Sequence, residues 1–341
     1  MIAELPAGAD ACGACGVELA PAMLACPACR KLVHSSRLQR LAAEASAAEG
    51  DARLTDALSA WREAMELLPH GSLQRREVGV NVARLSELVD ASRAKPPPKP
   101  GGGKAAAGLG AVGVVLWQAK YAALSLLGKA KLLAVGLTSL PTLLSMFAWL
   151  AIDRSHGIGF GVGLVASIYV HEMGHVFALR AYGIRATAPM FVPGFGALVR
   201  LHQYPIDARE DARVGLAGPV WGAAAAVVAL AIGLAIGSPT ALAVAALGAT
   251  INVFNLVPVW QLDGARGLRA LDARQRGIVV GVASIVALVL GQPIAWGVVV
   301  FGALRLKQDL PPKGDRRAFV TFVALLVGLS LVGWWATPAA P

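Results

Sequence analysis

Long apolar stretches separated by short polar segments fill the chain from residue 108 to its end. An α-helix needs about 20 apolar residues to cross a bilayer. Stretches that approach or reach this length cover Leu132–Ile152, Ile158–Arg180, Val214–Ile236, Ala241–Val257, Gly277–Leu290, Ile294–Leu306 and Ala318–Trp335. The pattern predicts a polytopic α-helical membrane protein with about six to seven spans.

Two stretches of this part leave alternatives open. Leu109–Leu127 is interrupted by Gln118, Lys120 and Tyr121, so it is either an interfacial helix or a poor span. The segment 277–306 forms either two short helices or one broken pair.

Residues 36–93 have the mixed polar and apolar periodicity of soluble amphipathic helices. Within them, Asp56–Pro69 resembles the second helix of a tetratricopeptide repeat, with Leu38–Ala48 as the first helix and Val78–Ala91 as a further one. A small helical hairpin is an equal alternative. Either form would offer a surface to a cytosolic protein partner.

A Pro- and Gly-rich segment at 94–107 divides the chain into two parts. Prolines make such a segment semi-extended and glycines make it flexible, so we expect a linker. The membrane-embedded domain then covers 108–341, and we expect it to work independently of the N-terminal module.

The charges indicate which side of the membrane each segment faces. Only 15% of the 341 residues are charged, against about a quarter in a soluble protein, and the net charge is +10. Basic residues fall into three interhelical groups: Arg180, Arg185, Arg200, Arg209 and Arg213; Arg266, Arg269, Arg274 and Arg276; and Arg305, Lys307, Lys313, Arg316 and Arg317. The alternate loops carry only Arg154. By the positive-inside rule the N-terminal part is cytosolic, and we expect no nucleic-acid partner.

Four cysteines lie within residues 1–35, as Cys12, Cys15, Cys26 and Cys29. Two C-x2-C pairs place four thiolates in tetrahedral reach of one zinc ion, which predicts a structural zinc ribbon. Two disulfides are the alternative. We favour zinc because Met1–Pro6 lacks the basic and apolar regions of a signal peptide, and cytosolic thiols stay reduced. His34 would be a weak substitute ligand.

Five residues, His171-Glu172-Met173-Gly174-His175, interrupt the apolar stretch Ile158–Arg180. On a helix, His171 and His175 lie one turn apart, so both can reach a single Zn²⁺, and Glu172 can act on a water at the metal. The alternative is that the three side chains hydrogen-bond one another within a helix bundle. Unpaired polar groups are costly in an apolar setting, so we favour a metal site.

A catalytic zinc site needs a third protein ligand. Asp263 lies at the end of an apolar run, where Pro258 should stop or bend the helix. Its competitors fit less well, because they lie in basic loops or on the opposite side. They are Asp153, Asp207, Asp211 and Asp272.

Two motifs together resemble the site-2 protease family of intramembrane zinc metalloproteases. They are H-E-x-x-H at 171–175 and N-x-x-P-x-x-x-L-D-G at 255–264, about 80 residues later. The resemblance covers roughly 130–275 and includes Ala217-Gly218-Pro219.

This resemblance implies roles for five residues. His171, His175 and Asp263 would bind a catalytic zinc, Glu172 would be the general base, and Asn255 would position or polarise the scissile carbonyl. It also implies that Pro189–Val199 forms a short membrane-dipping β-hairpin beside the site, and that Val192–Val199 could accept an unwound substrate strand by edge pairing.

From these features we expect an intramembrane zinc metalloendopeptidase that cleaves transmembrane or membrane-proximal segments of a membrane-protein substrate. We expect one catalytic and one structural Zn²⁺. We expect a multi-pass protein of a bacterial inner or plasma membrane. The alternatives are a metal-ion or proton transporter, which would need polar residues across the bundle, and a catalytically inactive scaffold.

Overall fold

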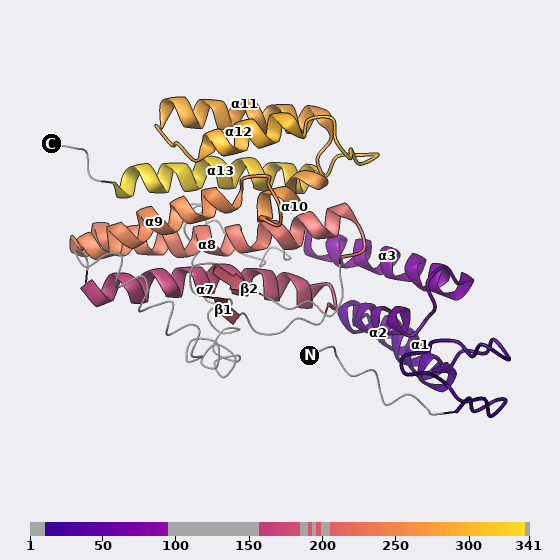
Figure 1. Ribbon diagram of the computed structural model, residues 1–341. Helices are drawn as coiled ribbons and strands as arrows, with labels where there is room; N and C mark the ends of the chain where they lie inside the picture. The colour runs from indigo at the N-terminus through magenta and orange to yellow at the C-terminus, as the bar shows by residue number, and fades with distance from the viewer. Residues whose placement is uncertain (1–10, 95–156, 185–189, 193–195, 199–204, 338–341) are drawn as a thin grey trace, which may run out of the picture.

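The computed structural model describes residues 11–94, 157–184, 190–192, 196–198 and 205–337. A module of three helices near the N-terminus adjoins one end of a stack of longer helices (Figure 1). The module contains α1 (Ser35–Gly50), α2 (Leu54–Glu66) and α3 (Leu73–Ala94). The stack contains α7 (Gly157–Ala181), α8 (Ala208–Ile236), α9 (Pro239–Asn255), α10 (Asp263–Arg269), α11 (Ala273–Val289), α12 (Ala295–Leu304) and α13 (Arg316–Ala336).

The three helices of the module lie where the sequence pattern predicts helices. α1 packs on α2 and α2 on α3, and a turn at Asp51 and Ala52 joins α1 to α2. The module buries small and branched side chains such as Leu41 and Leu58 between the helices. Whether the module is a repeat or a simple helical hairpin stays open.

Among the described residues, α7, α8 and α13 are long and apolar enough to cross a membrane. α9 and α12 are apolar but shorter. The segment 277–306, for which two short helices or one broken pair were expected, holds two separate helices, α11 and α12. The expected stretches 109–127 and 132–152 and the linker lie outside the described residues, so the number of spans stays a prediction.

The predicted span Val214–Ile236 lies within a longer helix, α8, which begins six residues earlier, at Ala208. Asp207 caps it by accepting a hydrogen bond of 2.7 Å from the amide of Glu210. A cap of this kind contributes about 1 kcal/mol, and it allows the polar residues 208–213 to form the first two turns. At the other end, Gly237 in the left-handed region (φ 63°) ends α8, and Ser238 caps α9.

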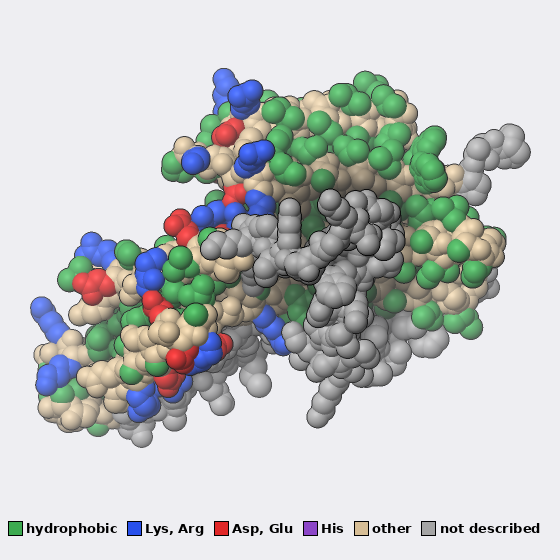
Figure 2. Space-filling view, turned by 180° about the vertical axis from the view of Figure 1, so that it is seen from behind, with side chains coloured by type: hydrophobic (Ala, Val, Ile, Leu, Met, Phe, Trp, Pro, Cys, Tyr) green, Lys and Arg blue, Asp and Glu red, His purple; other side chains and the backbone are tan. Residues whose placement is uncertain are grey.

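Most of the arginines that we placed in interhelical groups lie near the ends of helices. Arg180 is in the last turn of α7, and Arg209 and Arg213 are in the first turns of α8. The same holds for Arg266 and Arg269 in α10, Arg274 and Arg276 in α11, and Arg316 and Arg317 in α13. Arg185 and Arg200 lie outside the described residues. Figure 2 shows Lys and Arg side chains of the bundle at the end that adjoins the N-terminal module.

The outer surface of the bundle is apolar. Figure 2 shows hydrophobic side chains covering α11, α12 and α13, whereas Lys, Arg, Asp and Glu gather over the module and the bundle end beside it. Exposed examples are Val228 on α8, Leu288 on α11 and Trp334 on α13. Such a surface suits contact with lipid, and the described residues therefore form a helical membrane protein with a polar N-terminal module.

Two short strands, β1 (Met190–Val192) and β2 (Gly196–Leu198), pair antiparallel, with Phe191 opposite Ala197. β2 contacts α7, and the pair lies beside that helix in Figure 1. The rest of the expected hairpin, including Pro189 and Val199, lies outside the described residues.

Candidate metal centres

Three buried side chains from two helices meet inside the bundle. His171 and His175 lie one turn apart on α7, and Asp263 is the first residue of α10. The Nε2 atoms of the two histidines are 3.2 Å apart, and they lie 3.2 and 3.3 Å from the carboxylate oxygens of Asp263. The structure thus brings together the three residues that the two sequence motifs predicted.

The hydrogen bonds of the two Nδ1 atoms determine which nitrogen of each histidine can bind a metal. His171 Nδ1 lies 2.8 Å from Oδ1 of Asn252, and His175 Nδ1 lies 2.9 Å from the backbone oxygen of Val214. A backbone carbonyl oxygen can only accept a hydrogen bond. The same holds for Oδ1 of Asn252, which is identified as the oxygen because the amide nitrogen of this side chain donates to the carbonyl of Gly248. Both Nδ1 atoms therefore donate, and both Nε2 lone pairs point into the cluster.

The spacing of this cluster fits a tetrahedral metal ion. Ligands about 2.0–2.1 Å from a tetrahedral zinc lie about 3.4 Å from one another, close to the distances between His171, His175 and Asp263. Two imidazole lone pairs and a carboxylate facing one another would repel without a cation between them. The donor set and the geometry therefore fit Zn²⁺ with one position left for water or substrate.

Close packing of α8 against this cluster depends on glycine. A Cβ atom at Gly218 would lie 2.2 Å from Nε2 of His175, and one at Gly222 would lie 2.1 Å from Oδ1 of Asn252. A Cβ at Gly174 on α7 would lie 2.5 Å from the carbonyl of Ala217. These three positions let α7 and α8 approach closely and enclose the cluster.

The other two predicted site residues, Glu172 and Asn255, lie outside the three-donor cluster. Glu172 follows His171 on α7 and is half-buried, and Asn255 is the last residue of α9 and is also half-buried. Neither side chain has a hydrogen bond or ion pair with another described residue.

Asn252 is a site residue that sequence reasoning missed. It is a buried amide in the apolar helix α9, one turn before Asn255. A polar side chain in an apolar helix was the only sequence signal that pointed to it.

The rival third ligands have structural partners instead. Asp207 caps α8, Asp272 caps α11, and Asp211 accepts from Arg266 at 2.8 Å and from Arg269 at 3.3 Å. Asp153 lies outside the described residues.

The four cysteines form a second cluster at the N-terminus. Cys12 and Cys29 have their Sγ atoms 3.7 Å apart, and those of Cys15 and Cys26 are 3.6 Å apart. Sulfurs about 2.3 Å from a tetrahedral zinc lie about 3.8 Å apart, so the spacing fits Zn²⁺. None of the four forms a disulfide, and His34 is not among the clustered ligands.

Backbone amides prepare this cluster for a metal. The turn after Cys12 closes through Gly16 N–H to the Cys12 carbonyl, and the turn after Cys26 closes through Arg30 in the same way. Backbone hydrogen bonds, first from Ala14 and then from Cys15, lower the pKa of Cys12 to about 6. At Cys12 the thiolate, which is the form that binds zinc, is therefore favoured near neutral pH. The pKa of Cys15 is raised instead, to about 12.

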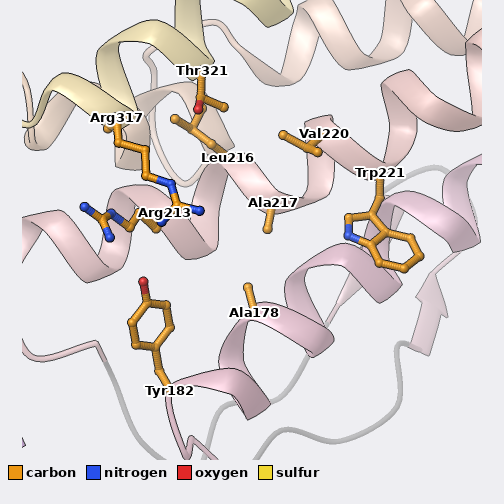
Figure 3. A pocket seen from close by; sticks show the side chains of 10 residues that line it. Ala178, Tyr182, Arg213, Leu216, Ala217, Val220, Trp221, Arg317 and Thr321 are labelled. Carbon is orange, nitrogen blue, oxygen red and sulfur yellow. The ribbon is translucent and has the colours of Figure 1, made fainter. Parts of the chain in front are cut away.

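A cavity of about 220 Å³ lies between α7, α8 and α13. Tyr182, Arg213 and Arg317 line one end and Trp221 lines the other, with Ala217 between them (Figure 3). Ala217 precedes Gly218, so the wall of this cavity is also the helix that encloses the histidines.

Comparison with known proteins gives consistent matches. The model of peptidase family M50 matches residues 159–242. The chain is 26% identical over 148 residues to a zinc metalloprotease of Methanocaldococcus jannaschii, covering 42% of each chain. It is 26% identical over 242 residues to a probable chloroplastic zinc metalloprotease of Arabidopsis thaliana, covering 54% of this chain and 44% of that one. A probable chloroplastic zinc metalloprotease of Oryza sativa subsp. indica is 25% identical over 218 residues, covering 48% of this chain and 40% of that one.

These alignments cover less than half the length of each of these curated relatives. No solved structure matches the chain. The family match includes both histidines and the glycines of α8 that enclose them, and the three relatives are named as zinc metalloproteases or probable ones. The match of residues 159–242 to peptidase family M50 and the similarity to proteins named as zinc metalloproteases support the resemblance to the site-2 protease family.

Proposed function

We propose that this chain is an intramembrane zinc metalloendopeptidase that cleaves a transmembrane or membrane-proximal segment of another membrane protein. The observation that carries the proposal is the cluster of His171, His175 and Asp263, buried among apolar helices, with a carboxylate on the next residue of the same helix. Ionisable side chains buried among apolar helices mark a functional site, and a metal held by them can activate a water molecule for hydrolysis.

In this proposal each residue has one task. His171, His175 and Asp263 would hold Zn²⁺, which when bound supplies Lewis acidity to a water molecule and to the substrate carbonyl. Glu172 takes the proton of the attacking water and passes it to the leaving amide nitrogen. Asn255, which has no partner among the described residues, donates from its amide to the scissile carbonyl.

The strand pair β1–β2 is the proposed place of substrate binding. A helical substrate shields its amides by internal hydrogen bonds, so it must unwind before cleavage. An unwound segment pairs with the open edge of a strand, and β2 contacts the helix that carries the histidines. We propose that this pair is the membrane-dipping hairpin that presents the extended segment to the site.

The proposal includes a second metal site, formed by the N-terminal cysteines. Cys12, Cys15, Cys26 and Cys29 would hold a second, structural Zn²⁺ with no open position. The positive-inside rule assigns the module to the cytosol, where it would meet a cytosolic protein partner. The proposed location is a bacterial inner or plasma membrane, crossed several times.

Glu172→Gln tests the proposal, because it removes the base and keeps every metal ligand. The full chain is reconstituted in liposomes with a fluorescent, membrane-anchored substrate that has an unstructured cleavage segment. General-base loss should lower kcat about 10²- to 10⁴-fold, while the zinc content stays that of the wild type. The matched control is Glu77→Gln, which alters an exposed glutamate on α3.

The control should cleave as the wild type does. Turnover by Glu172→Gln close to that of the control would contradict the assigned role. Zinc transport into the liposomes without cleavage by the wild type would favour the transporter instead. Membrane proteomics of cells with wild type or Glu172→Gln should then identify substrates as single-span proteins that accumulate uncut.

A further inference from the structure

The N-terminal module and the membrane helices share one hydrophobic core. Residues of α1, α2 and α3 pack against the C-terminal end of α7 and the N-terminal end of α8. The buried members of this shared core are Ala48, Ala57, Leu58, Val82, Leu85 and Val89 from the module, and Leu179, Tyr182, Ile184 and Val214 from the membrane part. The turn after α7 touches the module directly, because a Cβ atom at Gly183 would lie 2.7 Å from the amide nitrogen of Ser59.

A fully buried ion pair crosses this shared core. Arg62 on α2 is 3% exposed and Glu210 on α8 is 1% exposed, and they pair directly. Arg62 also donates to the backbone oxygen of Tyr182 at 2.9 Å. Glu210 further accepts from Ser86 Oγ at 3.0 Å and from the amide of Ile206 at 2.7 Å. Removing one member of such a pair leaves an uncompensated buried charge and strongly destabilises the contact.

A second polar network runs parallel to the first. Asp90 on α3 accepts from the hydroxyl of Tyr182 at 2.5 Å and pairs with Arg213 on α8. Arg213 donates at 2.8 Å to Asp315, the cap of α13. Figure 3 shows the hydroxyl of Tyr182 pointing toward Arg213. Burial, followed by the hydrogen bond to Asp90, raises the pKa of Tyr182 well above its ordinary value, so the phenol stays a donor.

The shared core lies one helical turn from the metal cluster. Val214 comes four residues after Glu210 on α8, and its side chain is fully buried in the shared core. Its backbone oxygen accepts the hydrogen bond from Nδ1 of His175. Leu179, another member of the shared core, comes four residues after His175 on α7. The module therefore packs on both helices that this hydrogen bond joins.

We propose that the N-terminal helices belong to the catalytic unit, and that Arg62 and Glu210 are positioning residues that hold the Val214 carbonyl against His175. Loosening the contact shifts the start of α8, weakens the hydrogen bond that orients His175, and so weakens the hold on the metal. Outer partners of metal-bound histidines change metal affinity or activity by about 10- to 100-fold. The activity readout of this inference rests on the proposed function.

Two variants of the full chain loosen the contact in different ways. Arg62→Met leaves the Glu210 carboxylate unpaired, and Gly183→Ala drives a methyl group into the backbone of Ser59 without changing any charge. Each has a matched control. Arg37→Met breaks the pair with Glu63 inside the module. Gly71→Ala strains a glycine of similar φ that has no atom near its Cβ position.

Three measurements follow each variant in liposomes: kcat and KM, the rate at which a zinc chelator inactivates the enzyme, and hydrogen exchange of the amides at 206–216. Arg62→Met and Gly183→Ala should lower kcat about 10- to 100-fold with KM unchanged, and should speed both inactivation and exchange. The two controls should behave as the wild type. Arg62→Met combined with Glu210→Gln should regain most of kcat, because it leaves no buried unpaired charge.

Faster exchange at 206–216 with unchanged kcat and unchanged inactivation would overturn the proposal, as would unchanged exchange in both variants. The double variant Arg62→Met with Glu210→Gln gives a further test. If its amides at 206–216 exchange normally but its kcat stays low, the proposal is also overturned. If the wild type does not cleave, the proposed function fails. In that case faster exchange together with faster chelator removal of zinc from both variants would still support the positioning role.

Discussion

Replacing Asn252 by leucine should weaken the catalytic metal site without touching a metal ligand. The side chain accepts the Nδ1–H of His171 at 2.8 Å inside the bundle. Leucine has a similar volume but no acceptor, so it leaves this N–H buried and unpaired, at a cost of about 1–3 kcal/mol. About 1.4 kcal/mol corresponds to a factor of ten, so zinc affinity and kcat/KM should fall about 10- to 100-fold.

The control comes from the same helix. Thr250→Val removes a side-chain hydrogen bond of 2.8 Å to the carbonyl of Ala246, away from the histidines, and should change neither quantity. Asn252→Asp keeps an oxygen acceptor for His171 and should retain the metal better than Asn252→Leu. Zinc affinity is measured by competition with a chelator of known affinity, and cleavage with the membrane-anchored substrate.

The reasoning would be refuted if Asn252→Leu bound zinc as tightly as Thr250→Val. That result would mean that packing alone holds the His171 ring, and that the hydrogen bond has no share in the affinity.

Three further expectations test the two metal sites. Asp263→Ala should remove the catalytic zinc and the activity, whereas Asp272→Ala should cost only a helix cap of about 1 kcal/mol and keep the metal, as metal counting on the purified variants will check. Gly218→Ala should abolish zinc binding because its Cβ would lie 2.2 Å from a ring nitrogen of the site, while Gly277→Ala, which faces open space, should leave activity and zinc content unchanged. The full chain should bind two zinc ions, and a fragment of residues 1–94 should keep one by elemental analysis after cytosolic expression; a metal-free fragment with two disulfides would contradict the ribbon.

The ligands of the metal clusters were predictable because each follows from spacing along the chain. An i, i+4 pair of histidines necessarily shares a helix face, and the two C-x2-C pairs close through local turns. Asp263 needed more, since only the pair of motifs linked it to a histidine helix 88 residues earlier in the chain. In the structure the four cysteines cluster, and so do the two histidines and Asp263.

Partners contributed by other helices were not predictable in this way. Asn252 meets His171 across 81 residues, and the carbonyl of Val214, at the start of the predicted apolar span, meets His175 across 39 residues. A backbone oxygen carries no sequence signal, and a single amide in an apolar helix has no spacing that names its partner. Only the packing of α8 and α9 against α7 determines which atoms face the outer nitrogens of the histidines.

The contact between the module and the membrane helices shows the same limit most clearly. Arg62 and Glu210 are 148 residues apart, and a Pro/Gly segment between them indicated two independent units. Charged residues at the ends of apolar helices are typical of solvated loops, so nothing in their pattern suggests burial. In the structure the same charges are the buried contacts that join the parts. A chain shortened to the membrane domain would lose Arg62 and leave Glu210 and Arg213 without partners from the module. We therefore expect that shortened chain to hold its catalytic zinc poorly, which contradicts the independence that the linker suggested.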